Sequence, residues 1–224
     1  MDTSKISFVA DVEATEGTRR PVRDGERTKA EILEVAIAEF GEKGLAGARI
    51  DEIAEATRTS KRMIYYYFES KEGLYLAALE ESYRRVRDNE RGLNLNDLDP
   101  ESAIRCLVTV TFDHHLRNES YIRMVMAENM NRGRYLAQSE QIQTLNRPAI
   151  DLIRGVYERG VRVGLFRPGL DPADIHASIS ALAFFNTSNR HTFSLIFKQD
   201  MRDPVYVATR RENVVQMVLR YLKA

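Results

Sequence analysis

One short stretch of the chain gathers cations and phenolic hydroxyls at helical spacing. The run 61–68 reads KRMIYYYF, and it follows a polar break at 58–60, RTS. Before the break, apolar-facing positions recur at the spacing of one helix face: Ile50, Ile53, Ala54 and Thr57. Cationic and hydroxyl side chains are the groups that hydrogen-bond phosphates and base edges. Two short helices joined by a tight turn would place the second helix in the DNA major groove, so the stretch predicts a helix-turn-helix.

The charge of the whole chain does not by itself favour nucleic acid. The 224 residues carry 33 Lys and Arg against 33 Asp and Glu, a formal net charge of zero. The local balance differs, because 58–71 holds the cations Arg58, Lys61, Arg62 and Lys71 and the single anion Glu69. A charged run is often only a solvated helix face. The prediction of DNA contact therefore rests on the tyrosines and the helix-turn-helix pattern as well.

The amino-terminal third resembles the TetR (tetracycline-repressor-like) family of transcriptional regulators. The residues that carry the resemblance are the helix end Phe40 to Gly44, Asp51-Glu52-Ile53-Ala54, Ser60, the run Ile64 to Phe68, and Ser70-Lys71-Glu72-Gly73-Leu74. The chain departs from the usual pattern at two places. Arg58-Thr59 replaces Gly-Val in the turn, where positive φ would cost a non-glycine residue about 1–2 kcal/mol. Arg62-Met63 replaces Gly-Thr, which changes the surface that faces DNA.

The resemblance implies a fold and a mode of action. We expect an all-α chain with a mobile tail over 1–25, a three-helix helix-turn-helix DNA-binding domain over 26–85 with its motif at about 49–68, and a helical effector-binding and dimerisation domain over 86–224. The implied function is that of a homodimeric repressor, released from palindromic double-stranded operator DNA by a small-molecule effector. No cofactor is expected.

The expected DNA contacts divide into two groups. Lys61 and Arg62 begin the second helix of the motif, where base edges are nearest. The resemblance adds Met63 and Tyr65 as groove-facing residues. It places three more near phosphates, with Arg49 as a further phosphate candidate: Tyr66, Tyr67 and Lys71. Each tyrosine is about as well explained by packing with a satisfied hydroxyl. Ile64 and Phe68 are expected in the core.

Local signals predict where the helices begin and end. Thr28 with Glu31 reads as a capping box, and Gly44 as the stop of that first helix. Ser70 is expected to cap a connector helix that runs to about Arg91. Asp-Pro pairs predict three further helix starts: Asp99-Pro100, Asp171-Pro172 and Asp203-Pro204. Pro148 is expected to open another helix, and the stretch 92–98 to be the loop between the domains.

The resemblance also implies an effector cavity among the carboxy-terminal helices. Cavities of this kind are mostly apolar with a few polar groups. The candidate lining residues are Arg105, Phe112, His115, Tyr121, Arg123, Met124, Met126, Asn129, Tyr157, Phe184, Phe185, Asn189 and His191. For any single aromatic residue among them, ordinary core packing is the competing explanation.

Assembly is expected through the last two long helices. The segment 177–185, ASISALAFF, has small or apolar residues on every face. A helix that is apolar all round is buried, either within one chain or between chains. The resemblance adds that such regulators dimerise by packing two carboxy-terminal helices of each subunit into a four-helix bundle. A twofold dimer would match a palindromic operator.

Other chemistries find less support in the sequence. Nucleophile-elbow, phosphate-loop and Cys-x-x-Cys motifs are absent, so we expect no enzyme. His115 and Glu119 stand one helical turn apart and could share a metal, but no third ligand accompanies them. The main alternative to a DNA-binding repressor is a small-molecule-binding module that acts on protein partners through its helix-turn-helix surface. The arginines at 19, 20, 23 and 27 could form a minor-groove arm or a tail that only aids solubility.

Compartment signals favour the cytoplasm. The chain has a single cysteine, Cys106, which fits a reducing environment and reads as a core residue. A run of about 18 apolar residues, as a membrane-spanning helix needs, does not occur. The first residues lack the basic start and apolar run of a signal peptide.

Overall fold

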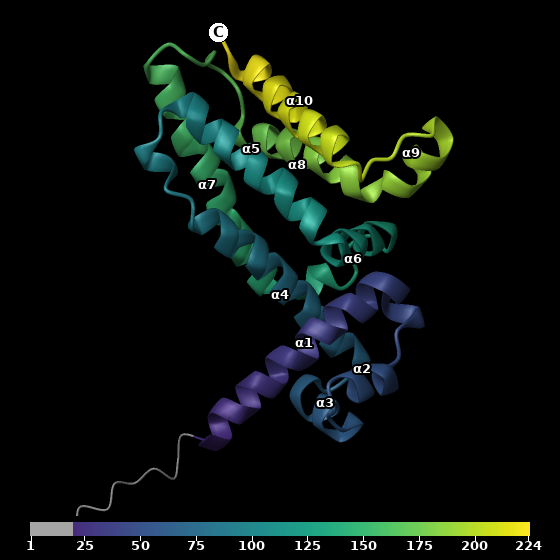
Figure 1. Ribbon diagram of the computed structural model, residues 1–224. Coiled ribbons are helices and arrows are strands. Elements are labelled where there is room, and N and C mark those ends of the chain that lie inside the picture. Colours follow the sequence, from purple (N-terminus) through teal and green to yellow (C-terminus); the bar gives the residue numbers. More distant parts are fainter. Residues whose placement is uncertain (1–19) are drawn as a thin grey trace, which may run out of the picture.

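The computed structural model describes residues 20–224, which fold into helices (Figure 1). The elements are α1 (Arg20–Gly47), α2 (Ile50–Ala56), α3 (Lys61–Phe68), α4 (Lys71–Arg91), the 3-10 turn η1 (Leu95–Asp97), α5 (Pro100–Arg117), α6 (Glu119–Met130), the 3-10 turn η2 (Leu136–Gln138), α7 (Glu140–Arg162), α8 (Pro172–Ser188), α9 (Arg190–Phe197) and α10 (Pro204–Leu222). One isolated β-bridge joins Phe166 to Lys223. The predicted all-α fold, with an amino-terminal helix-turn-helix and a carboxy-terminal helical part, is confirmed.

The first three helices and the start of α4 enclose a core of their own. In Figure 1 they lie together at one end of the molecule. Phe40, Ile53, Ile64 and Leu74 are each no more than 1% exposed there. These residues are the apolar faces that the helical spacing predicted, and their burial fixes α3 against α1 and α2. The predicted core positions Ile64 and Phe68 are both buried.

Helix α1 begins earlier than the sequence indicated. It starts at Arg20, so Thr28 lies inside the helix and the predicted start at that residue is wrong. Pro21 stands in the first turn of α1, a position at which proline costs no helical hydrogen bond. The stretch 20–25 is thus helical and no part of a tail, whereas 1–19 lies outside the described residues.

Gly44 interrupts α1 with a positive φ, which glycine adopts without strain, but the chain makes one more helical turn after it. Its φ of +66° and ψ of 174° leave the helical region, and the backbone then coils again as far as Gly47. The peptide N–H of Ala48 donates to the carbonyl of Gly44 over 3.0 Å, which closes that last turn. Gly44 is therefore a break near the end of the helix rather than its last residue.

Helix α4 connects the two parts of the molecule, as predicted. The Ser70 hydroxyl accepts a hydrogen bond from the Gly73 N–H at 2.9 Å, and the helix continues to Arg91. Its first half packs in the amino-terminal core through residues such as Leu79. Its second half runs away from α3 and lies along α7 (Figure 1).

Helices α5, α7, α8 and α10 surround a second, larger core. Ile104, Phe112, Ile175 and Leu222 are each no more than 1% exposed in it. The aspartates before the three Asp-Pro helices each accept a backbone N–H with their side chain: Asp99, Asp171 and Asp203. All three predicted helix starts are confirmed, because capping depends only on neighbouring residues.

Helix α7 does not begin at Pro148, so that prediction is wrong. The helix starts at Glu140, where the Ser139 hydroxyl accepts the Ile142 N–H at 3.1 Å. Pro148 lies inside α7. A proline can remain in a helix interior when packing on both sides holds the helix together. Ile142 and Ile153, on either side of Pro148, are buried in the two different cores.

The two parts of the molecule meet over a broad junction, of which α4 is only one component. Helix α6 packs along α1, and a Cβ added at Gly41 would lie 2.7 Å from the Ser120 Cα. Arg123 on α6 binds Glu42 on α1 through both its carboxylate, at 3.0 Å, and its carbonyl, at 2.9 Å. The connector helix α4 is therefore joined by α6 in linking the two parts.

A buried carboxylate lies at the centre of this junction. Glu128 on α6 is 3% exposed, and one of its oxygens accepts the Tyr75 hydroxyl of α4 at 3.1 Å. Its other oxygen accepts the backbone N–H groups of Tyr135 and Leu136 at 3.1 and 3.0 Å. Burial and this carboxylate together raise the pKa of Tyr75 well above its usual range. Glu128 thus holds α4, α6 and η2 together.

Two further features bear on partners. Within residues 20–224, no helix is both long enough and apolar enough to cross a membrane.

The short helix α9 was not foreseen, although its run of apolar residues could have indicated it. Three of its side chains are exposed on the surface: Leu195, Ile196 and Phe197.

Candidate nucleic-acid interface and effector cavity

The start of α3 is fixed by a capping side chain and an ion pair. The Ser60 hydroxyl accepts the N–H of Met63 at 3.2 Å. The Lys61 ammonium forms an ion pair with Asp51 of α2, and Arg49 lies 3.8 Å from the same carboxylate. One carboxylate therefore orients two of the cations that the sequence singled out, while all three side chains remain largely exposed.

The turn between α2 and α3 accepts a backbone conformation that favours glycine. Arg58 has a φ of +52°, so it adopts the strained conformation instead of avoiding it. The next peptide N–H, of Thr59, donates to the Ala54 carbonyl over 3.0 Å and closes the turn. The strain costs about 1–2 kcal/mol and leaves the Arg58 side chain exposed beside α3.

The two faces of α3 differ sharply. Ile64 is fully buried, whereas Tyr65 is 45% and Tyr66 is 75% exposed. Arg62 is also exposed, and Tyr67 is partly buried against the amino-terminal core. The exposed face of α3 is thus cationic and phenolic, and Tyr66 stays exposed although its ring meets that of Tyr67 edge-on at 5.3 Å.

Two further candidates lie at the borders of this face. The Lys71 ammonium donates to the carbonyl of Ala46 over 3.3 Å, which holds the start of α4 against the end of α1. Of the amino-terminal arginines, Arg20 and Arg23 fall in the first turns of α1. Arg27 is exposed, and its Nε lies 3.6 Å from the Glu31 carboxylate. The fourth, at position 19, lies outside the described residues.

A cavity lies where α4 ends. It measures about 470 Å³ and is bounded by the last turn of α4, the 92–98 loop with η1, and α7. Its lining residues are Arg87, Glu90, Arg91, Leu93, Asn94, Leu95, Asn96, Asp97, Leu145, Pro148, Ala149 and Leu152. A volume of a few hundred cubic ångströms with mixed apolar and polar walls suits a small molecule.

The loop that forms one wall is held rigidly. Arg159 of α7 donates to the carbonyls of Leu95 and Leu98 at 2.8 and 3.1 Å, and to Asn96 at 3.1 Å. Leu95 itself is 1% exposed and belongs to the carboxy-terminal core. The predicted domain-boundary loop is therefore an ordered wall of the cavity.

An ion pair with unmet hydrogen-bonding capacity lines the cavity. The Arg87 Nη1 lies 2.5 Å from the Glu90 Oε2, and both residues are buried. Burial raises the pKa of the Glu90 carboxyl. The Arg87 Nε has no hydrogen-bond partner among the described residues. Sequence analysis did not select either residue, because charged residues late in a connector helix read as a solvated face.

The effector residues expected from sequence are not brought together as a set, and none of them lines this cavity. Three form one aromatic cluster: the His115 ring lies 6.3 Å from Tyr121 and 6.1 Å from Phe184, measured between ring centroids. Tyr121 borders a separate cavity of about 250 Å³ between α1, α4 and α6. Phe112 and Tyr157 are buried in the carboxy-terminal core.

The remaining expected effector residues lie apart from one another. Arg105 pairs with Glu212 on the surface at 2.7 Å, Arg123 is bound to α1, and Met124 lies in the amino-terminal core. Met126, Asn129, Asn189 and His191 are exposed, and Phe185 stacks edge-on against Phe193. These residues therefore do not lie at one common place in the structure.

The paired histidines are buried and uncharged at neutral pH. Desolvation, with a smaller contribution from the Arg87 guanidinium, lowers the pKa of both His114 and His115 to about 4. The side-chain amide nitrogen Nδ2 of Asn89 lies 2.8 Å from the His114 Nδ1. The Glu119 carboxylate binds Arg190 instead of sharing a metal with His115. Over 20–224, no group of three or more metal-ligating side chains is found.

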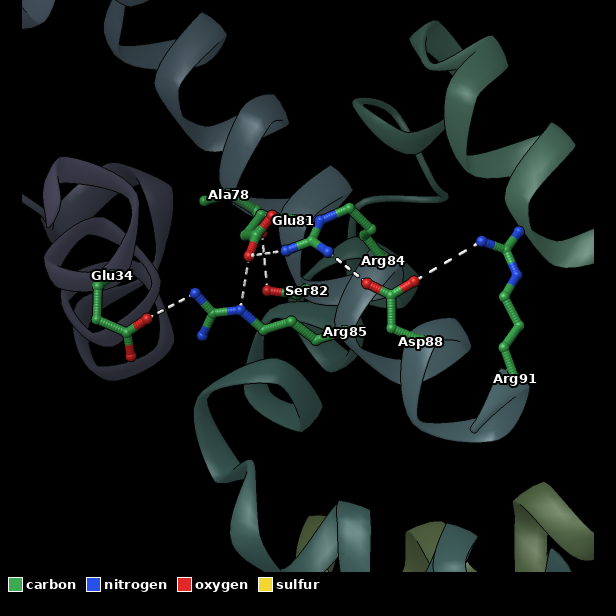
Figure 2. A network of polar contacts seen from close by, with 8 residues as sticks. All are labelled: Glu34, Ala78, Glu81, Ser82, Arg84, Arg85, Asp88 and Arg91. Atoms are coloured by element: carbon green, nitrogen blue, oxygen red, sulfur yellow. Dashed lines mark hydrogen bonds and ion pairs between the residues drawn. The ribbon is translucent and has the colours of Figure 1, made fainter. Parts of the chain in front are cut away.

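A surface network ties the middle of α4 to α1 (Figure 2). Arg85 of α4 donates to Glu34 of α1 at 2.6 Å and to Glu81 at 2.8 Å. Arg84 joins Glu81 to Asp88, the residue that Arg91 approaches to 3.7 Å at the cavity. The charged side chains in the second half of α4 therefore pair with one another along the helix and, through Arg85, with α1.

A capped, exposed cationic helix on a three-helix unit, joined to a helical part with a cavity, defines a helix-turn-helix transcriptional regulator. Two family models match the chain: "Bacterial regulatory proteins, tetR family" over 32–78 and "Tetracyclin repressor-like, C-terminal domain" over 100–218. The chain belongs to the TetR family. It is a DNA-binding transcriptional regulator and not an enzyme.

Relatives and solved structures agree with this assignment. The transcriptional repressor NicS of Pseudomonas putida is 32% identical over 201 residues, which cover 90% of this chain and 95% of that protein. The repressor SCO4008 of Streptomyces coelicolor is 34% identical over 140 residues, which cover 62% of this chain and 69% of that protein. The regulator SCO4942 of Streptomyces coelicolor superimposes with a TM-score of 0.65 at 27% identity, covering 87% and 98% of the two chains.

Proposed function

We propose that the chain is a repressor that binds a palindromic operator as a homodimer and is released by a small-molecule effector. The observation that carries the DNA-binding part is the exposed face of α3, with Arg62 free of packing and Tyr66 75% exposed. The names of its relatives NicS and SCO4008, both called transcriptional repressors, favour repression. Action on genomic DNA would place the protein in the cytoplasm.

The proposed DNA contacts are assigned by their place around α3. Lys61, Arg62, Met63 and Tyr65 would enter the major groove, because they occupy the first turns of the recognition helix. Four more would contact phosphates at its borders: Arg49, Tyr66, Tyr67 and Lys71. Binding phosphate would require Arg49 and Lys61 to exchange Asp51 for DNA, which is a small cost for exposed ion pairs.

The proposed effector site is the cavity of about 470 Å³ at the end of α4. Three features of the cavity support this assignment: its size, its leucine-rich wall and its position at the end of α4, the helix that follows α3 in the chain. A ligand there would contact the last turn of α4 directly. Because α4 is linked to α1 by Arg85 and to α6 through Glu128, a shift of its end would move the DNA-binding part.

Dimerisation is proposed through α8 and α10. Ala173, Ala177 and Ala181 are exposed at a spacing of four residues, which forms one stripe of small side chains along α8. On α10, Val205 is 74% and Met217 is 39% exposed. Exposed apolar surface on adjacent helices is typical of an interface. The two recognition helices would have to lie about 34–36 Å apart to meet successive major grooves.

A paired titration tests this proposal. Operator affinity is measured with and without effector, and effector affinity with and without saturating operator DNA. Linkage requires both affinities to fall by the same factor, with a coupling of about 1–3 kcal/mol. Equal effector affinities in the two conditions would remove the coupling but leave DNA binding intact. Failure to shift DNA from the upstream region of its own gene would instead favour a module that acts on protein partners.

A further inference from the structure

The chemical class of the effector can be read from Arg87, a buried charged residue of the cavity wall whose N–H donors are only partly met. Arg87 is 7% exposed, yet its Nε has no hydrogen-bond partner in the described part of the chain. A guanidinium carries five N–H donors in a planar fork. Leaving such donors unmet in a buried site is unfavourable, especially on a charged group. Arg87 is therefore prepared to bind an acceptor that the free protein does not supply.

Arg87 has one carboxylate in direct contact. Its carboxylate contact is Glu90, reached through Nη1 alone at 2.5 Å, and burial raises the pKa of that carboxyl. His114 and His115, whose pKa values the Arg87 charge helps to lower, are uncharged at neutral pH. A buried guanidinium with one carboxylate neighbour is thus available to a second anion, and a carboxylate can meet two of its N–H groups at once.

We infer that the cavity binds a small organic acid, whose carboxylate pairs with Arg87 and whose apolar body lies against Leu93, Leu145 and Leu152. This inference rests on the proposed function, which makes the cavity the effector site. A neutral apolar ligand would leave the Arg87 Nε unmet, and an organic cation would be repelled by Arg87 and Arg91. A doubly charged phosphate ester is disfavoured because the carboxylates of Glu90 and Asp97 line the same space.

The first measurement compares acids with their neutral isosteres in the absence of DNA. Thermal unfolding of the full chain is followed with benzoate, 1-naphthoate or hexanoate, and with benzamide, 1-naphthamide or hexanamide at equal concentrations. We expect at least one acid to raise the melting temperature and its amide to leave it unchanged. Equal stabilisation by acid and amide would overturn the inference, as would a panel in which no acid stabilises the chain.

The second measurement assigns the effect to Arg87. Replacing Arg87 alone would leave Glu90 buried without its partner, so the test variant carries Arg87→Gln and Glu90→Gln together. We expect it to keep its helical circular dichroism and to bind the stabilising acid about tenfold more weakly or worse. The matched control is Arg154→Gln on α7, which does not line the cavity and whose side chain is 48% exposed. Its effect should stay within about threefold, because solvent screens that charge.

The failures of the two proposals are distinguishable. Undiminished acid binding by the double variant, or an equal loss in Arg154→Gln, would show that Arg87 does not select the carboxylate. Operator binding is measured separately by fluorescence anisotropy without any acid. If the acid binds through Arg87 but operator affinity does not change, the effector role falls while the organic-acid site stands.

Discussion

At the scale of residues, what distinguishes this regulator is the set of side chains at the start of α3. Arg58 accepts a φ of +52°, and Arg62 and Met63 occupy positions at which the family usually has other residues. Arg62 is exposed, so it is free to reach a base edge, whereas Lys71 is partly engaged with the Ala46 carbonyl. The two cations should therefore contribute to DNA binding in different ways.

Replacing each of these cations by alanine tests the difference. Arg62→Ala should change sequence preference and cost about 1–3 kcal/mol on the best site, because a bidentate contact to one base is lost. Lys71→Ala should weaken binding to all sequences alike and lower the salt slope by about one unit. Binding is measured by anisotropy on operator variants over a salt series. Identical behaviour of the two variants across sequences would contradict the assigned roles.

The buried histidines predict how stability depends on pH. Desolvation lowers the folded-state pKa of His114 and His115 to about 4, beneath the ordinary histidine value of 6.5. The unfolded chain therefore binds more protons as pH falls through 6.5, and the folded state loses stability until about pH 4. Urea unfolding at pH 7 and pH 5 should show this loss. A His114→Gln and His115→Gln double variant should show less of it, and an equal loss would contradict the cause.

At the scale of elements, the junction of α1, α4 and α6 matters as much as the connector helix. Arg85 joins α4 to α1, Arg123 joins α6 to α1, and Glu128 joins α6 to α4. These links join the start and middle of α4 to α1 and α6. A ligand-induced movement at the cavity can then reach α3 along more than one route.

Glu128 is the junction residue whose replacement should be most costly. Glu128→Ala would leave the Tyr75 hydroxyl and the N–H groups of Tyr135 and Leu136 without their acceptor. We expect a loss of about 2–4 kcal/mol in the free energy of unfolding. Glu128→Gln is the control, because its amide oxygen can still face the two N–H groups while the amide N–H₂ meets the tyrosine. If alanine and glutamine prove equally mild in urea titrations, the network is not important for stability.

At the scale of the whole molecule, the proposed twofold assembly explains why α8 keeps small exposed residues. Ala177 and Ala181 lie on the surface of a helix whose other residues include the buried Ile179. Small side chains let two helices approach closely, and a second copy would also cover exposed apolar side chains such as Val205 of α10. The distance between the two recognition helices is then set by this interface.

A charge placed in the stripe should separate the subunits. Ala181→Glu would put two buried like charges across the interface, so the variant should be monomeric in sedimentation analysis and lose most of its operator affinity. Ala137→Glu is the control, since Ala137 is an exposed alanine of η2, away from α8 and α10. A dimeric Ala181→Glu, or an Ala137→Glu that dissociates as well, would place the interface elsewhere.

Local patterns in the sequence predicted the helix-turn-helix and several helix starts. Ser70 and the aspartates of the Asp-Pro pairs cap the helices that were expected from them, because a cap depends on residues two or three positions away. The same local reasoning failed at α1 and α7. In α1 it preferred the cap at Thr28 to the proline in the first turn, and in α7 it took Pro148 as a start although packing carries the helix through it.

Only the tertiary structure decided where the cavity lies and which residues face it. Arg87 and Leu152 are far apart in sequence, and nothing in their types indicates that they line one space. Of the aromatic residues chosen from sequence, Phe112 and Tyr157 are buried in the carboxy-terminal core, because a large apolar side chain packs in any apolar environment and its type does not indicate which one. Tyr75 and Glu128 likewise meet across 53 positions of the chain. Such contacts follow from the packing of whole helices, which no local pattern encodes.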